Sequence, residues 1–283
     1  MLTVKNLSKS YGRKRVLHSI DLEFDNQVYG LLGANGAGKT TLIRCMAGLY
    51  EPQQGQILYH DQPIQKSPVF FHDLGYLPQA FGMFQELTLY EMMEYICCLK
   101  KIDKSQYSNE IEHALSSVNL EDKKHDRIKT LSGGMVRRAG ITQAILGFSK
   151  VIFLDEPTAG LDPGERARFK NTVNTIKNDR MILISTHIVE DVDACCQNVI
   201  VIEAGQVLFQ GTCEQLKQAA AQKVYQIKAE DSNNITGENF VLKVNEIEGE
   251  IYHRVLAQGK QNYPYEENPT LEDGYMCLVK GLA

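Results

Sequence analysis

Apolar and polar residues alternate near the start of the chain, a pattern typical of strands with one buried face. Residues 2–4 and 16–24 show this alternation, and we expect them to form antiparallel strands. Residues 28–32 are continuously apolar and run directly into Gly33, after which residues 40–49 carry apolar side chains at helical spacing. Further short strands are expected at residues 56–59 and 74–77.

The middle of the chain changes to a helical pattern, which extends over residues 87–120. Three short, fully apolar runs follow, separated by segments with helical spacing. Such runs are typical of parallel strands that are buried on both faces. They lie at residues 151–154, 181–184 and 199–202.

The composition changes near residues 218–222. Beyond that point, residues 224–227 and 240–256 alternate as strands, and Thr270 opens a final short helix after Pro269. The chain is therefore expected to be α/β, with a nucleotide-binding core on a parallel sheet. Besides this core we expect an N-terminal antiparallel β subdomain, a helical subdomain and a small C-terminal α+β extension. The expected limits are 1–218 for the main domain, about 80–148 for its helical subdomain and 219–283 for the extension.

Composition narrows the possible functions. Of the 283 residues, 43% are hydrophobic and 23% charged, as in ordinary globular proteins. A formal charge of -5 disfavours a broad nucleic-acid surface, so no direct nucleic-acid partner is expected. The first residues lack the order of a signal peptide, and no apolar run is long enough to span a membrane. We therefore expect the chain to fold in the cytosol and to reach a membrane only through a partner.

A glycine-rich loop provides the first sign of chemistry. Residues 33–40 read GANGAGKT and match the P-loop pattern G-x-x-x-x-G-K-[ST]. The loop follows an apolar strand and opens a helix, so its backbone N–H groups and the helix dipole favour bound phosphate. Lys39 is expected to reach the β- and γ-phosphates, and Thr40 to ligate Mg²⁺.

The apolar run at residues 151–154 ends in two carboxylates, Asp155 and Glu156. A carboxylate at the end of a buried strand is suited to hold Mg²⁺, and we expect Asp155 to do so. Glu156 lies beside it, where a general base or a group that orients water is needed. Solvated charges that merely end the strand are the alternative interpretation.

A second glycine-rich segment lies between these two motifs. Ser132, Gly133 and Gly134 precede a helical stretch and so present N–H groups to an anion. Because one nucleotide cannot occupy two distant anion sites of one chain, the pattern suggests a head-to-tail dimer in which this segment covers the γ-phosphate held by the other copy. Simple capping of the helix by Ser132 explains the short motif equally well.

Together these motifs resemble the ATP-binding cassette (ABC) ATPases in both order and spacing over about residues 2–217. Besides the three segments above, the resemblance rests on Gln79 after YLP, on the sequence AGLD ending at Asp162, and on STH ending at His187. The resemblance implies that Tyr11 stacks on adenine, that Gln79 senses Mg²⁺ and water, and that Asp162 communicates across the dimer. It further implies that His187 contacts the γ-phosphate and orients Glu156.

The implied site can be stated residue by residue. The catalytic residues are Lys39, Gln79, Glu156 and His187, and the Mg²⁺ ligands are Thr40, Gln79 and Asp155. The implied ATP-binding residues are Tyr11, Gly33, Ala34, Asn35, Gly36, Ala37, Gly38, Lys39, Thr40, Thr41, Ser132, Gly133, Gly134 and Asp162.

Two features concern the subtype. Met135 stands where the family usually has glutamine, and Val136, Arg137 and Arg138 follow it. This resembles the single-cassette ATPases of ABC-2 type exporters, as does the segment PTLED at residues 269–273, although a plain capped helix also explains the latter. Apolar and aromatic residues between 81 and 90 suit a groove for a membrane subunit, or they pack the helical subdomain itself.

The resemblance thus implies an ATP-hydrolysing transporter subunit at the cytoplasmic face of the cell membrane. ATP-driven closure of a homodimer would power export through separate permease subunits. The alternatives are an importer subunit and a soluble ABC ATPase with an accessory or assembly role. The short interval between Lys39 and Leu131 lacks sustained heptads, which excludes the long coiled coil of chromosome-maintenance ATPases.

Overall fold

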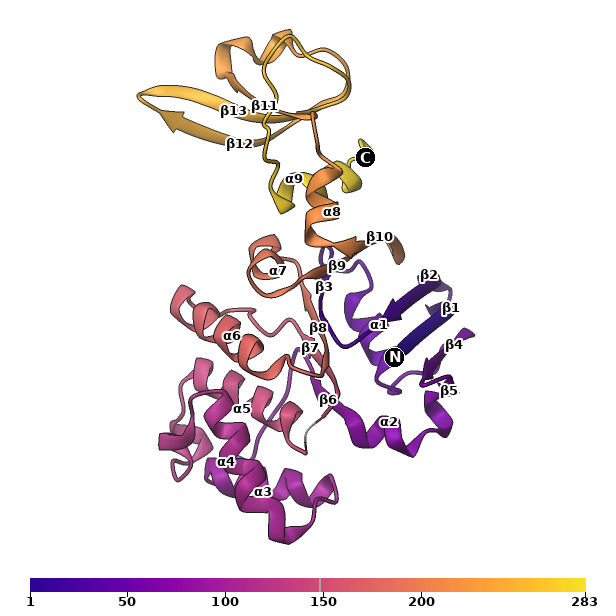
Figure 1. Ribbon diagram of the computed structural model, residues 1–283, viewed down its shortest axis with the longest axis vertical. Helices are drawn as coiled ribbons and strands as arrows, with labels where there is room; N and C mark the ends of the chain where they lie inside the picture. The colour runs from indigo at the N-terminus through magenta and orange to yellow at the C-terminus, as the bar shows by residue number, and fades with distance from the viewer. Residues whose placement is uncertain (148) are drawn as a thin grey trace. The chain divides into compact units, whose positions relative to one another are not determined.

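A central six-stranded sheet organises the fold in the computed structural model, which describes residues 1–147 and 149–283 (Figure 1). The strand order is β10-β9-β3-β8-β7-β6, and β6-β7, β7-β8, β8-β3 and β3-β9 are parallel pairs. The α/β fold with a parallel sheet is confirmed. Its strands are β3 (Val28–Leu32), β6 (Leu74–Leu77), β7 (Val151–Asp155), β8 (Met181–Thr186), β9 (Asn198–Glu203) and β10 (Gln206–Thr212).

The side chains of β7 alternate between two hydrophobic cores. Ile152 and Leu154 pack in the core that the helical subdomain covers, whereas Val151 and Phe153 pack in the core shared with the N-terminal sheet. Because every side chain of β7 is buried, the strand reads in sequence as one continuous apolar run rather than as an alternation.

The N-terminal sheet is antiparallel and has the strand order β2-β1-β4-β5. Its alternating strands bury residues such as Leu7 and Leu17 against α1 (Lys39–Met46) and the central sheet. The antiparallel β subdomain is thus confirmed, although β1 is longer than residues 2–4. The strands are β1 (Leu2–Tyr11), β2 (Lys14–Phe24), β4 (Gln54–Tyr59) and β5 (Gln62–Pro63).

The helical subdomain consists mainly of α3, α4 and α5, which lie together below β6 in Figure 1. Thr88 and Glu91 form a capping box that starts α3, because each side chain accepts a hydrogen bond from the other residue's backbone N–H. The bounds are α3 (Leu89–Leu99), α4 (Tyr107–Ser117) and α5 (Gly133–Ile145). Residue 148, the expected end of this subdomain, lies outside the described residues.

Three further α-helices, of 6, 14 and 7 residues, belong to the main domain. The first of them, α2, starts at Pro68, where Ser67 caps it by accepting a hydrogen bond from Phe70 N–H. The apolar pattern of the sequence did not predict this helix. These helices are α2 (Pro68–Asp73), α6 (Pro163–Ile176) and α7 (Val189–Cys195). No helix in the described part of the chain combines the length and hydrophobicity that a membrane crossing requires.

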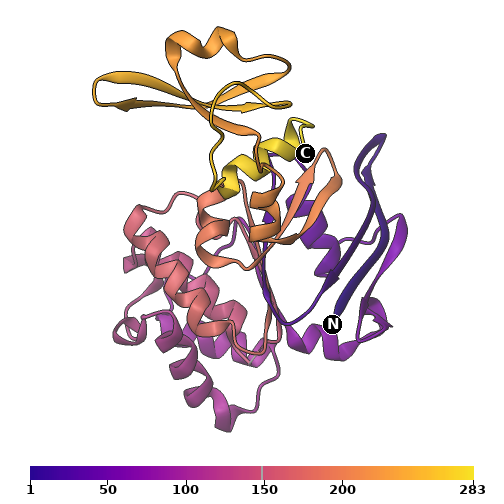
Figure 2. The same ribbon diagram turned by 45° about the horizontal axis from the view of Figure 1, so that its top comes forward.

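The chain divides into two compact units at Val207 and Leu208. The second unit contains an antiparallel sheet of order β11-β13-β12 and two helices that pack together (Figure 2). The expected division at residues 218 and 219, as a limit between independent domains, stays a prediction. The elements are α8 (Cys213–Gln218), β11 (Val224–Lys228), β12 (Asn239–Ile247), β13 (Glu250–Ala257) and α9 (Leu271–Val279).

A buried ion pair joins β13 to α9 within the second unit. Arg254 donates two hydrogen bonds to Asp273, through Nε at 3.0 Å and Nη2 at 2.6 Å. Asp273 also closes a capping box with Thr270 at the start of α9. Burial raises the pKa of this carboxyl group, but the hydrogen bonds from Arg254 and Thr270 outweigh it and leave the pKa below its usual value.

Close packing of α5 on β6 depends on Gly75. A Cβ at this position would lie 1.9 Å from the carbonyl oxygen of Ala144. We therefore expect Gly75→Ala to cost about 1–3 kcal/mol of stability, because two backbones must move apart. The control is Gly82→Ala, where a Cβ meets nothing within 4 Å. Urea unfolding measures both variants, and equal midpoints would contradict this account.

Candidate functional site

The loop between β3 and α1 forms a nest of backbone N–H groups at the carboxyl edge of the sheet. Gly38 has a φ of 111°, which residues with a Cβ rarely adopt. A Cβ at Gly33 would lie 2.3 Å from the carbonyl oxygen of Ile202, so this position requires glycine. The loop therefore lies tightly against β9, and a glycine-rich loop before a helix N-terminus can turn its N–H groups toward a bound phosphate.

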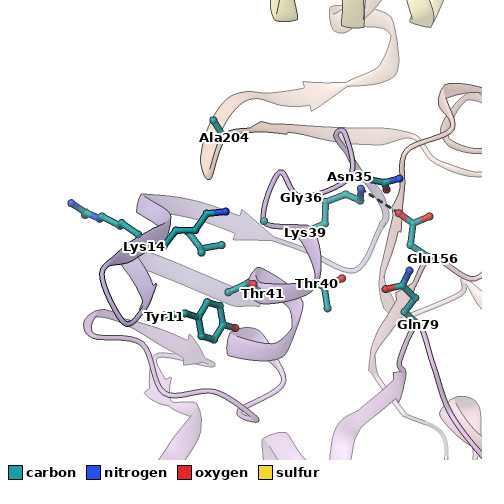
Figure 3. Close-up of a pocket in the computed structure, with 13 residues that line it drawn as sticks. Tyr11, Lys14, Asn35, Gly36, Lys39, Thr40, Thr41, Gln79, Glu156 and Ala204 are labelled. Atoms are coloured by element: carbon teal, nitrogen blue, oxygen red, sulfur yellow. Dashed lines mark ion pairs between the residues drawn. The ribbon is translucent and has the colours of Figure 1, made fainter.

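Lys39 is the first residue of α1 and is only 5% exposed. Its Nζ donates hydrogen bonds to the carbonyl oxygens of Gly33, at 2.7 Å, and Ala34, at 3.2 Å. It also lies 3.2 Å from Glu156 Oε1, an ion pair drawn in Figure 3. The ammonium group is thus held beside the phosphate-binding loop and faces the end of β7.

Asp155 ends β7 and is completely buried. Its Oδ1 accepts hydrogen bonds from Ser185 Oγ at 2.6 Å and Thr40 Oγ1 at 3.3 Å, whereas Oδ2 has no hydrogen-bond partner among the described residues. A buried carboxylate oxygen without a partner is costly unless a cation satisfies it. Thr40 and Asp155 together thus offer oxygen ligands of the kind that Mg²⁺ prefers.

Glu156 follows in a left-handed conformation, with a φ of 50°, which is unusual for a residue other than glycine. Its backbone N–H donates to Ser185, both to Oγ at 2.9 Å and to the carbonyl oxygen at 3.2 Å. Its Oε2 lies 3.0 Å from Nδ1 of His187. Glu156 as a whole is only 4% exposed, and its carboxylate is held between Lys39 and His187.

Lys39, Thr40 and Glu156 line a cavity of about 710 Å³, shown in Figure 3, whereas Asp155 and His187 are not among its lining residues. Glu156 and Gln79 lie together on one side of it, and Tyr11 lies on the other, with Thr41 between them. Tyr11 is 46% exposed, and Lys9 Nζ lies 5.9 Å from the centroid of its ring. The cavity is lined by Tyr11, Lys14, Arg15, Val16, Asn35, Gly36, Gly38, Lys39, Thr40, Thr41, Gln79, Glu156 and Ala204.

The second glycine segment and Asp162 do not line this cavity. Ser132 caps α5 by accepting a hydrogen bond from Met135 N–H at 3.3 Å, and Asp162 caps α6 in the same way through Glu165 N–H at 2.9 Å. Among the described residues, a Cβ at Gly133 would meet nothing within 4 Å, whereas one at Gly134 would lie 2.7 Å from the Glu165 side chain. Ser132 and Gly133 are thus the open part of the segment. Capping and anion binding are compatible here, because capping engages only one of the free N–H groups.

Sequence reasoning missed several contacts of the site. Ser185 was noted only as part of a motif, yet it links Asp155 to the backbone of Glu156. Tyr76 lies near the site at the end of β6, where burial and the negative charge of Asp155 raise its pKa, so the phenol stays neutral. Arg137, noted only as a mark of subtype, reaches the backbone at the end of β7. No local sequence signal identifies these contacts, since all three depend on how separate strands and helices meet.

Comparison with known proteins connects this geometry to a family. The family described as "ABC transporter" matches residues 17–159. The chain is similar to the lipopolysaccharide export system ATP-binding protein LptB of Haemophilus influenzae, with 33% identity over 222 residues that cover 76% of this chain and 92% of LptB. It is also similar to the Nod factor export ATP-binding protein I of Cupriavidus metallidurans, with 32% identity covering 76% of this chain and 72% of that protein.

Solved structures show the same similarity. The structure of cbiO1 from Clostridium perfringens, part of the ABC transporter complex cbiONQ, superposes with a TM-score of 0.69 at 28% identity. The match covers 76% of this chain and 89% of cbiO1.

Ser185 provides a test of the site's internal support. In Ser185→Ala, the N–H of Glu156 loses the hydroxyl acceptor and Asp155 loses a donor, so we expect a loss of about 1–3 kcal/mol of stability. We also expect slower ATP hydrolysis, because both carboxylates lose an orienting contact. Ser117→Ala, which removes an exposed hydroxyl that donates to His113, is the control. Unfolding curves and steady-state ATPase rates of the two variants should differ clearly, and matching values would refute the supporting role.

Proposed function

The chain belongs to the ABC transporter family of ATPases, and from that premise we propose that it powers export through separate membrane subunits. Membership establishes an ATP-binding, ATP-hydrolysing transporter subunit. The direction of transport, the pairing of two copies and the role of each site residue are parts of the proposal. The observation that carries it is the buried carboxylate of Glu156, held between Lys39 and His187 at the phosphate-binding loop.

In the proposed mechanism the loop of residues 33–41 and Lys39 bind the phosphates of ATP, and Tyr11 stacks on the base. Glu156 accepts a proton from the attacking water, and His187 holds the carboxylate through its contact with Oε2. Thr40, Asp155 and Gln79 would hold Mg²⁺, which neutralises charge on the phosphate oxygens when bound. The partnerless Oδ2 of Asp155 supports this assignment.

The segment formed by Ser132, Gly133 and Gly134, whose first two residues are exposed, supports a two-chain site. These residues lie outside the cavity of their own chain, yet the start of α5 offers free N–H groups and a positive dipole end. We infer that they complete the nucleotide site of a second copy. Asp162, at the start of α6, would act at the same interface. ATP would thus hold two chains together, and hydrolysis would release them.

Export is favoured over import by two observations. The relatives include proteins whose names specify export of lipopolysaccharide and of Nod factor. The second observation is Met135 with Arg137 and Arg138 after it, the pattern that resembles the ATPases of ABC-2 type exporters. An importer subunit is the alternative, because the fold shared with cbiO1, part of an ABC transporter complex, does not itself set the direction of transport.

An aromatic surface near Gln79 is the proposed contact with the permease. Phe84 and Tyr95 pack edge to face with ring centroids 5.4 Å apart, yet they remain 56% and 43% exposed. Exposed aromatic pairs on a surface suit a partner helix better than solvent. The chain would therefore be peripheral to the membrane at its cytoplasmic face. Met83 and Leu89 of the same region are instead buried in the core of the helical subdomain. Some residues of this region therefore pack that core, and others are free to contact a membrane subunit.

Glu156→Gln tests the catalytic and dimer proposals together. Loss of the proton acceptor should lower kcat by about 10²–10⁴-fold while ATP still binds, so the variant should accumulate as an ATP-bound dimer. Size-exclusion chromatography with light scattering in ATP and Mg²⁺ measures this, and Glu190→Gln is the control on an exposed position. A variant that stays monomeric with ATP bound would rule out the two-chain site.

Phe84→Glu tests the proposed permease contact. Placing a charge on the aromatic surface should shift the protein from the membrane fraction to the soluble fraction of its own cells, because the apolar contact is lost. Val241→Glu is a matched control, since Val241 is 50% exposed but lies in the second unit. Both variants should keep ATPase activity in isolation. Equal partitioning of the two would count against this surface.

A further inference from the structure

We propose that Arg137 is a positioning residue that holds the backbone of Glu156 in its active conformation. It also joins that backbone to the segment between β6 and α3 that contains Gln79, called the Gln79 loop below. Arg137 belongs to α5, the helix that begins at the Ser132–Gly134 segment. Its guanidinium group crosses to the end of β7 and donates hydrogen bonds to the backbone there. Neither the family match nor the P-loop pattern assigns a role to this side chain.

The contacts of Arg137 involve backbone carbonyl oxygens of two separate segments. Nε donates to Pro157 at 2.9 Å, and Nη2 donates to Asp155 at 3.2 Å and to Glu156. Nη1 donates to the carbonyl oxygen of Gln79 at 3.0 Å. One planar group thus binds three consecutive carbonyls after β7 and one carbonyl of the Gln79 loop, and a single ammonium group could not satisfy this fork.

The conformation of Glu156 makes these contacts important. A non-glycine residue with a φ of 50° persists only where its surroundings hold it, because that region of backbone conformation costs free energy. Ser185 holds the N–H side of Glu156, and Arg137 holds its carbonyl side. The Glu156 carbonyl also accepts a hydrogen bond from Ala159 N–H at 3.3 Å, so losing Arg137 would weaken rather than abolish the hold on this peptide. The carboxylate would then be kept less firmly between Lys39 and His187.

Placing the positive charge of Arg137 at this site costs free energy of desolvation. Burial lowers the pKa of Arg137, while the negative charges of Asp155 and Glu156 oppose that shift. The ring of Phe81 lies 5.6 Å from the guanidinium carbon and covers it. The partly buried guanidinium makes three hydrogen bonds to carbonyl groups at the end of β7 and a fourth to the carbonyl of Gln79. It is therefore positioned by the loop that contains Gln79 and Phe81 as well as by α5.

The link also bears on communication between sites, a step that rests on the two-chain site proposed above. There, the start of α5 contacts a nucleotide held by the second copy. Arg137 lies one turn into the same helix, so it connects that contact to Glu156 of its own chain. Each carboxylate is then positioned when α5 and the Gln79 loop are both in place.

The test compares Arg137→Gln and Arg137→Lys with wild type and with Arg127→Gln, a control arginine whose side chain is 58% exposed. We expect kcat for ATP hydrolysis to fall about 10–100-fold in Arg137→Gln, with ATP affinity within about threefold of wild type, since the residue supports the catalytic group rather than the ligand. Arg137→Lys should be nearly as slow, because it keeps the charge but not the fork. Arg127→Gln should match wild type.

A second measurement separates this role from a loss of folding and from failure of the two-chain site. ATP binding and thermal unfolding are measured for the Arg137 variants, and ATP-dependent dimerisation for Glu156→Gln with and without Arg137→Gln. A lower kcat with ATP affinity retained supports the positioning role, whether or not Glu156→Gln forms a dimer. If Glu156→Gln stays monomeric, only the two-chain site and the communication step fail. An unchanged kcat in Arg137→Gln, or equal loss of ATP affinity and kcat, overturns the inference.

Discussion

The candidate site depends on two adjacent carboxylates buried at the end of one strand. Asp155 is completely inaccessible and Glu156 is 4% exposed, and burying such charges without partners would cost several kcal/mol. Their partners come from neighbouring elements, since Lys39 and Thr40 begin α1 after β3, and Ser185 lies in β8, one residue before its end. The carboxyl ends of parallel strands meet at one edge, so only the assembled parallel sheet brings these groups together.

The strand that carries these carboxylates, β7, also separates the two hydrophobic cores. Each face of β7 is covered, one by the helical subdomain and the other by α1 and the N-terminal sheet. Both carboxylates are therefore buried, and Glu156 lines the cavity. The close approach of α5 to β6, which Gly75 permits, also brings α5 alongside the end of β7. The packing that stabilises the sheet thereby carries Arg137 to the catalytic backbone.

Much of the fold could be predicted because its signals are local. The apolar runs at 151–154 and 181–184 correspond to β7 and β8, and the capping residues Thr88 and Thr270 start α3 and α9. Helix α2 was missed because its six residues are too short to show a helical repeat and depend on capping by Ser67. The expected helix at 40–49 instead ends at Met46, where Gly48 turns the chain with a φ of 74°.

The sequence by itself determined the chemistry that this protein carries: a phosphate-binding loop, two carboxylates at a strand end and a second glycine segment, in the order of the ABC family. These are local patterns, and the local backbone geometry that they need follows from neighbouring residues. Only the tertiary structure decided which atoms meet. The ion pair of Lys39 with Glu156, the bridge through Ser185 and the reach of Arg137 join residues far apart in the chain. Such contacts arise from strand register and helix packing, which no short stretch of sequence encodes.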